Sequence, residues 1–351
     1  MTKPLIQYEW SESESLEQEF LDIPQYVYDN DPLWPGEDSM NIKHQFSKSN
    51  PWLATGKVWI GYIREEARIA GFCSVTESGE VIARFGFWET NNNFFPNKRL
   101  FSALSRWAHR QGATMLIGPI NFSTLGKYRL RLDNPRFSPF YGEPYNPSWY
   151  QTILTRLGFS QIGRYFSVFD QTLTVRTLAL PSQTEDYIAE HNITLKPLSP
   201  LLWDKHQENL YKVTTNSFSK NLGWTSCKKD FFDWNFNKTT IRSFCHAPGS
   251  CLVFDSSEQI IGLLFNLIDN TYQAGILKTI MITPKFRRSL LYPALLKQFI
   301  NSCGPNVPYL GTALVNLKGP VAATALKACH SPKKWFHYYG LFNKDIRNEL
   351  L

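Results

Sequence analysis

The chain has 351 residues, of which 43% are hydrophobic and 15% aromatic, and it carries a formal net charge of +7. This length suits two domains of about 150 to 200 residues better than one. No apolar run approaches the roughly 20 residues of a membrane helix, and Glu12, Glu14 and Glu17 stand where a signal peptide would be basic and then apolar. We therefore expect a soluble, cytoplasmic protein with no membrane contact, whose positive charge favours acidic partners.

The first half of the chain follows a clear order of elements. Residues 13–21 have helical spacing of apolar residues and lead into a loop. From Val58 the pattern predicts the order βββαβαβ, with the first helix closing at Gly112. These elements cover residues 58–63, 69–77, 81–89, 99–112, 113–121, 147–159 and 164–174. Residues 122–147, rich in turn formers and aromatics, form a long loop of the kind that is often functional.

The second half repeats this order after two helical segments, at residues 199–221 and 230–236. The later elements are predicted at residues 250–268, which form a hairpin, and at 272–282, 289–302, 309–315, 321–329 and 333–342. Pro181, Ser182 and Pro197 surround a charged segment that reads as a linker. We therefore expect an N-terminal domain over residues 1–175, a linker over 176–197 and a C-terminal domain over 198–351.

The six cysteines are scattered and form no CxxC pair. This spacing indicates reduced, mostly buried thiols rather than a disulfide framework. His246 adjoins Cys245 and lies near Cys251, but the sequence offers no second ligand pair at the spacing of a zinc site. We expect no bound metal.

Four segments of the first half resemble a bacterial family of GNAT-like proteins, in which a strand, a Trp-bearing helix, a GPxNFST segment and a YNPxxY helix occur in this order. The matching segments are FGFWE, SRWAHRQGAT, GPINFST and EPYNPSWYQTILTRLGF, at residues 85–89, 105–114, 118–124 and 143–159. The resemblance implies an α/β (α+β) protein of two tandem GNAT-like domains. Each domain would be a mixed, mostly antiparallel sheet flanked by helices.

The second half resembles the acyl-CoA motif of the GNAT superfamily through ITPKFRRSLLYPALL, residues 282–296. Typical members have a glycine-rich turn here, and backbone N–H groups at the next helix start hold the pyrophosphate. Arg287 stands where the motif has its arginine, but Arg288, Leu290 and Tyr292 occupy glycine positions. The resemblance implies that this domain binds an acyl-CoA, such as acetyl-CoA, or a phosphopantetheine thioester. The implied contacts are Ile280, Ile282, Lys285, Arg287, Arg288 and Asn316, the last of which also suits a turn.

Acyl transfer needs a donor to the developing oxyanion and a proton source for the leaving thiolate. In GNAT-like enzymes the donor is a backbone N–H of the fourth strand, which is residues 279–283 here. The proton source is often a Tyr on the helix after the fifth strand, but residues 321–329 contain none. Tyr292, Tyr338 and Tyr339 are the candidate substitutes, because a phenol can donate a proton to a thiolate, although each also suits packing.

The candidate acceptor residues lie in the first half. Glu89 ends an aromatic strand and is a candidate base or ammonium ligand, with a salt-bridged strand end as the alternative. In the long loop, Tyr128, Arg129 and Tyr145 combine cations with rings, which suits an anionic or ring-bearing acceptor. Packing of the loop explains the aromatics equally well.

Together these features predict an acyltransferase that moves an acyl group from a CoA or acyl-carrier-protein thioester to an amine or hydroxyl of a small molecule. The basic surface also suits an aminoacyl-tRNA-dependent transferase, whose binding would weaken steeply with salt. The missing glycines and tyrosine suit a third class, a noncatalytic ligand-binding protein with the same fold.

Overall fold

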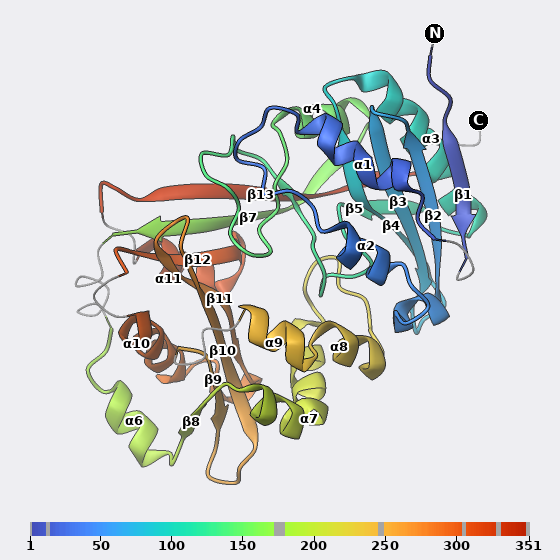
Figure 1. Cartoon of the computed structure of the whole chain (residues 1–351). Helices are drawn as coiled ribbons and strands as arrows, with labels where there is room; N and C mark the ends of the chain where they lie inside the picture. Colours follow the sequence, from blue (N-terminus) through green and yellow to red (C-terminus); the bar gives the residue numbers. More distant parts are fainter. Residues whose placement is uncertain are drawn as a thin grey trace. The chain divides into compact units, whose positions relative to one another are not determined.

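A computed structural model describes residues 2–11, 15–171, 180–244, 249–303, 307–327 and 331–348 of the chain (Figure 1). It divides into two units, each assembled from separate stretches of sequence. The first unit contains Met1–Arg164, Leu222–Trp234 and Tyr339–Leu351, and the second contains Tyr165–Asn221 and Asn235–Tyr338. No helix within the described residues is long and apolar enough to cross a membrane.

The first unit is built on a sheet in which all neighbouring strands are antiparallel except β4 and β5. Its strand order is β1 (Ile6–Trp10), β2 (Gly56–Ile63), β3 (Ala67–Val75), β4 (Val81–Thr90), β5 (Met115–Gly118) and β13 (Trp335–Asp345). The short β6 (Leu130–Arg131) pairs with β13 at Tyr339 and Gly340. This arrangement leaves β4 at the centre of the unit.

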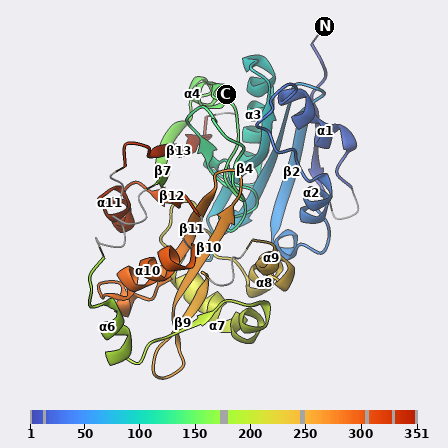
Figure 2. The ribbon, with the colours of Figure 1, turned by 60° about the vertical axis from the view of Figure 1, so that its left-hand side comes forward.

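Helices cover both faces of this sheet, with α3 on one side and α1 and α2 on the other (Figure 2). The helices and turns are α1 (Gln18–Val27), α2 (Ser39–Gln45), η1 (Pro51–Ala54), α3 (Phe94–Arg110), α4 (Trp149–Arg156) and α8 (Lys229–Asn235). Helix α3 begins after Asn93, whose side chain accepts the Phe95 N–H, so FFPNK is the first helical turn rather than the predicted loop. Its residues Leu100, Leu104 and Trp107 are buried against the strands.

The second unit repeats the same sheet pattern, with β11 and β12 as its parallel pair. Its strand order is β8 (Thr194–Pro197), β9 (Cys251–Phe254), β10 (Ile260–Asp269), β11 (Ala274–Ile282), β12 (Tyr309–Asn316) and β7 (Ser160–Asp170). The remaining elements are α6 (Thr184–Glu190), α7 (Pro200–Phe218), α9 (Lys238–Phe244), η2 (Pro284–Phe286), α10 (Leu291–Cys303) and α11 (Pro320–Lys327). Helix α10 buries Leu295 against Leu264 and Leu277 of the sheet.

The last strand of each sheet comes from the other half of the sequence. In the first unit β5 pairs with residues 342–345 of β13, near the end of the sequence. In the second unit β12 pairs with residues 165–170 of β7, which follows the elements of the first unit. The predicted boundaries at residues 175 and 198 run along the chain and do not include this exchange of strands.

The predicted fold class, an α/β protein with two units of mixed, mostly antiparallel sheet flanked by helices, is confirmed. The segment predicted as a linker contains regular elements: α6 packs on α10, and β8 forms the edge of the second sheet. Short edge strands of four residues, such as β8, carry too little alternation to be recognised. Strand β1 was not predicted either, although its five residues IQYEW alternate apolar and polar side chains.

Candidate functional site

In the second unit, β11 is an irregular strand that parts from its parallel neighbour β12. The pairing with β10 shifts after Phe265, which leaves Lys278 of β11 as an extra residue in a bulge. The ladder to β12 covers only residues 274–277 of β11. Beyond it, Leu314 of β12 has a φ of 55°, and its N–H donates to Ser167 Oγ at 3.0 Å. Within the described residues, no strand pairs with residues 279–282 of β11 on this side.

This unpaired edge presents two backbone donors. Thr283 N–H donates to Ile261 O at 2.9 Å, which fixes which residues of β11 bond to β10. Because antiparallel pairing alternates, the N–H groups of Ile280 and Ile282 point away from β10. These two residues are the cofactor contacts predicted from the sequence. The edge has the chemistry to donate a hydrogen bond to a carbonyl oxygen that gains negative charge.

The turn after β11 offers an anion more side-chain charge than backbone N–H groups. Arg287 Nε donates to Ile282 O at 3.0 Å, so this side chain folds back onto the strand end. At the start of α10, the Leu291 N–H donates a hydrogen bond to Ser289 Oγ at 3.1 Å, and Pro293 has no N–H to offer. Lys285 and Arg288 are exposed on the same turn. Phosphates bound here would be held mainly by these exposed cations.

The three candidate tyrosines do not share one environment. Tyr292, half-buried on α10, has its pKa raised to about 12 by burial. Tyr338 stacks on Phe336, with ring centroids 6.0 Å apart and planes 12° apart. Tyr339 is fully buried, belongs to the first unit and donates to the Glu143 carboxylate. Tyr292 and Tyr338 thus lie in the second unit, with Ile280 and Ile282.

Asn316, the last residue of β12, is exposed and makes a turn contact. Its Oδ1 accepts the Lys318 N–H at 2.9 Å, which is the role of an Asx turn. The turn role that the sequence left open is therefore present at this residue. A contact with a cofactor remains a prediction.

The first unit has the equivalent strand edge, but its own chain fills it. Strand β4 bulges at Phe87, whose φ is 46°, and pairs with β5 only at residues 83 and 84. Ile120 N–H then donates to Phe85 O at 2.7 Å, and Asn121 Oδ1 accepts the Phe87 N–H at 2.9 Å. A Cβ on Gly86 would lie 2.5 Å from that Oδ1, so only glycine permits this approach. The backbone edge of β4 is therefore hydrogen-bonded by its own chain. The equivalent edge of β11, at Ile280 and Ile282, has no such bonds among the described residues.

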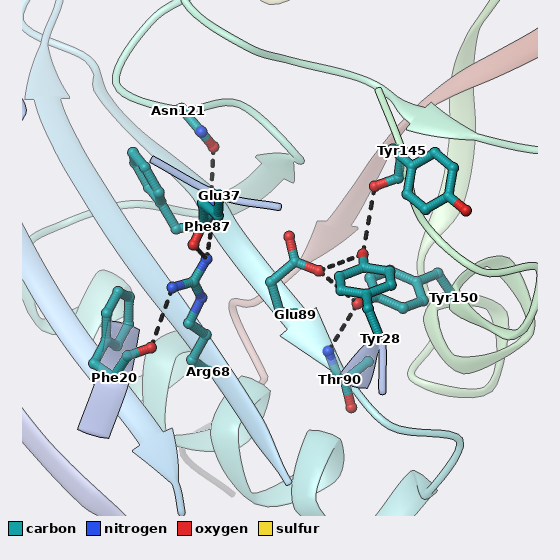
Figure 3. A network of polar contacts seen from close by, with 10 residues as sticks. All are labelled: Phe20, Tyr28, Glu37, Arg68, Phe87, Glu89, Thr90, Asn121, Tyr145 and Tyr150. Carbon is teal, nitrogen blue, oxygen red and sulfur yellow. Dashed lines mark hydrogen bonds and ion pairs between the residues drawn. The ribbon is translucent and has the colours of Figure 1, made fainter. Parts of the chain in front are cut away.

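The first unit instead carries a carboxyl group held by two tyrosines, shown in Figure 3. Glu89 Oε2 accepts from Tyr28 OH at 2.6 Å and from Tyr150 OH at 2.8 Å. The Tyr150 hydroxyl is fixed in turn because it accepts the Thr90 N–H at 2.8 Å. Burial raises the pKa of Glu89 above its usual value, although nearby Arg68 opposes this shift. Glu89 is therefore a positioned carboxyl group whose charged form is poorly solvated.

Arg68 lies directly opposite Glu89 on β3, yet its guanidinium is engaged elsewhere. It donates to both carboxylate oxygens of Glu37, at 2.7 and 2.6 Å, and to Phe20 O at 3.1 Å (Figure 3). No described cation lies within 4.0 Å of the Glu89 carboxylate. The salt-bridged strand end that the sequence left open is thus not what forms among these residues.

The three loop residues predicted to bind an acceptor divide into a pair and a single residue. Arg129 stacks its guanidinium on the Tyr128 ring, 3.8 Å from the centroid, and also donates to the Tyr128 hydroxyl. Tyr145 is buried near Glu89: its ring centroid lies 5.8 Å from that of Tyr28, and its hydroxyl donates to Asp31 at 2.7 Å. Of the three, Tyr145 is the one that the structure brings to Glu89.

Sequence reasoning missed Tyr28, Glu37 and Arg68, which surround Glu89. Tyr28 comes at the end of α1 and Glu37 in the following loop, both far from Glu89 in sequence. Arg68 lies just before the strand predicted at residues 69–77, although β3 already begins at Ala67. An arginine in a strand that is otherwise apolar was the one local signal available.

The described residues contain no group of three or more His, Cys, Asp or Glu side chains able to hold a metal ion. Cys73, Cys227, Cys251 and Cys303 are buried and in no disulfide, as predicted for reduced thiols. Cys245, His246 and Cys329 lie outside the described residues.

No protein-family model and no curated protein matches the chain. Solved structures do match it. A tandem GNAT protein from the clavulanic acid biosynthesis pathway is 12% identical, with 98% of this chain and 99% of that chain covered and a TM-score of 0.57. A conserved protein from Enterococcus faecalis, described as a probable N-acyltransferase, is 10% identical, with 98% and 73% covered and a TM-score of 0.57. A GCN5-related N-acetyltransferase from Kribbella flavida is 8% identical, with 98% and 72% covered and a TM-score of 0.52. By its fold, this chain is similar to tandem GNAT proteins.

Proposed function

We propose that this protein is an acyltransferase that takes its acyl group from the thioester of coenzyme A or of a pantetheine-bearing carrier protein. The acceptor is an amine or hydroxyl of a small molecule. The observation that carries the proposal is the unpaired edge of β11, where the N–H groups of Ile280 and Ile282 point away from β10. The fold likeness to GNAT proteins supports the same activity in general terms.

The residues of the second unit fit the thioester donor in two respects. Ile280 and Ile282 offer backbone donors for the thioester carbonyl, whose oxygen gains charge during acyl transfer. Lys285 and Arg288 supply positive charge for phosphates, in place of the glycine-rich turn that this chain lacks. A bound thioester supplies an activated acyl group, so the chain needs no covalent nucleophile of its own.

Tyr292 and Tyr338 are the two candidate proton donors in this unit. The Tyr292 phenol is protonated at neutral pH, and burial raises its pKa to about 12, which makes it a weaker acid than a free phenol. A phenol in this state can donate a proton to a leaving thiolate. Tyr338, stacked on Phe336, remains the second candidate.

The test is acyl-CoA binding and turnover by a charge-reversed variant. In Lys285→Glu/Arg288→Glu, the affinity for acetyl-CoA should fall about tenfold, because two exposed cations near the phosphates become anions. Binding is measured by isothermal titration calorimetry, and turnover by thiol release with a panel of primary amines and alcohols. Tyr292→Phe should lower turnover more than binding.

The matched control is Lys205→Glu/Arg242→Glu, which makes the same charge change at exposed positions on α7 and α9 of the same unit. This control variant should bind acetyl-CoA only slightly more weakly than the unmodified protein, because only the net charge of the protein changes. If both double variants bind acetyl-CoA as the unmodified protein does, or if that protein binds no thioester at all, the proposed function is wrong.

A further inference from the structure

The Glu89 carboxyl group is half-buried, and no cation among the described residues pairs with it directly. Arg68, its cross-strand neighbour, is already paired with Glu37 through both carboxylate oxygens. Lys127 acts on Glu89 only through its longer-range field. Moving a carboxylate out of water is costly unless it is paired or hydrogen-bonded. The two tyrosine hydrogen bonds compensate Oε2 only, so a cation at Oε1 would stabilise the charged group further.

The two oxygens of Glu89 have different roles. Oε2 accepts both tyrosine hydroxyls, from Tyr28 and Tyr150, which fixes the orientation of the carboxyl group. Oε1 has no partner within the described residues, and it is not among the side-chain atoms sealed from solvent. Glu89 as a whole is only half-buried. One oxygen is therefore anchored and the other is open to a ligand.

Aromatic rings stand beside the carboxyl group, on the side of Oε2. Tyr28 stacks on Trp34, with centroids 4.9 Å apart and planes 15° apart, and Tyr145 lies against the same Tyr28 ring. Figure 3 shows Tyr28, Tyr145 and Tyr150 gathered on one side of Glu89. The negative face of an aromatic ring attracts a cation, most strongly where water is excluded.

We infer that Glu89, with the rings of Tyr28 and Tyr145, forms a binding site for the primary ammonium group of a small molecule. A single open carboxylate oxygen suits an N–H donor, which a quaternary ammonium lacks. A guanidinium prefers to bind both oxygens, and Oε2 is already occupied by the tyrosines. The remaining alkyl or aryl part of the ligand would lie against the rings.

This inference is independent of the proposed acyl transfer. The ammonium site lies wholly in the first unit and requires no thioester. It would stand if the protein bound amines and transferred nothing, and it would fail on its own if the protein transferred acyl groups but bound no amine at Glu89.

The experiment compares butylammonium with butan-1-ol, two probes of similar size that differ in charge, by saturation-transfer NMR titration of the full chain. The unmodified protein should bind butylammonium saturably and more tightly than butan-1-ol. Glu89→Gln keeps the shape and an acceptor for the tyrosines but removes the charge, so butylammonium affinity should fall about tenfold or more. Its affinity for butan-1-ol should not change.

Two further variants separate binding from folding. Glu80→Gln removes a carboxylate that is exposed on the β3–β4 turn of the same unit, and it should bind butylammonium like the unmodified protein. Tyr145→Leu keeps Glu89 but removes a ring, so it should weaken butylammonium by a smaller factor than Glu89→Gln. Thermal midpoints and circular dichroism establish that each variant is folded. Equal binding of the two probes, unchanged affinity in folded Glu89→Gln, or no saturable butylammonium binding would each overturn the inference.

Discussion

We expect Glu89 to reduce the stability of the first unit at neutral pH. Because burial raises the pKa of Glu89 in the folded state, the folded protein binds a proton at this group more readily than the unfolded chain does. The stability that this proton contributes is fully present below the ordinary glutamate pKa of about 4.3, and it is lost as the pH rises through the pKa of the folded state. Glu89→Gln should therefore raise the thermal midpoint at pH 7, and the difference should shrink as the pH falls. Thermal unfolding over a pH series measures it.

The reference for this prediction is Glu80→Gln, whose exposed side chain should give a difference that does not depend on pH. A lower thermal midpoint for Glu89→Gln at pH 7 would contradict the prediction. It would mean that the bonds from Tyr28 and Tyr150 to the charged carboxylate outweigh the cost of its burial.

For single residues, the sequence identifies a candidate such as Glu89 more readily than it identifies the neighbours of that residue in the fold. Glu89 was recognisable as a carboxylate at the end of an aromatic strand. Tyr28 and Tyr150 reach it from helices on either side of it in the sequence, and neither pattern nor spacing encodes such a meeting. Tyr292 is a second example: the sequence identified its phenol, but its burial depends on packing around α10.

At the level of elements, the two parallel strand pairs show how the same irregularity has two outcomes. Both β4 and β11 carry a bulge and both part from the next strand. In the first unit Asn121 closes the edge by accepting the Phe87 N–H. Asn121→Ala should destabilise the protein by about 1 to 3 kcal/mol, because it leaves that buried donor without an acceptor. Chemical denaturation measures the loss.

Asn121→Asp keeps an oxygen at the same position and should cost less than Asn121→Ala. If the two variants are equally destabilised, the bond to Phe87 does not hold the edge closed. The sequence presented GPINFST as a family-like segment, and the order of elements around it could be predicted. Its role could not, because it depends on the positive φ of Phe87 and on the close approach at Gly86.

For the molecule as a whole, the exchange of β7 and β13 makes each unit depend on both halves of the sequence. A fragment of residues 1–175 lacks the strand that pairs with β5, and one of residues 176–351 lacks the strand that pairs with β12. Each fragment alone should therefore aggregate or show little cooperative unfolding, because exposed strand edges associate. Co-expression should restore a soluble 1:1 complex, detected by size-exclusion chromatography and circular dichroism.

Cooperative unfolding of the 1–175 fragment alone, with a midpoint near that of the full chain, would show that the exchanged strand is dispensable. The sequence predicted two repeats of one strand and helix order, which is the pattern that the units have. It could not reveal the exchange, because the apolar pattern of β13 does not indicate which strand will be its neighbour in the sheet.

The position of β13 also sets the timing of folding during synthesis. The residues that pair with β5 emerge from the ribosome only after all of the second unit has been made. Nascent domains usually fold in order from the N-terminus. Here the earlier unit waits for the later one, so its β5 edge stays uncovered through much of translation, when a chaperone would be most useful to it.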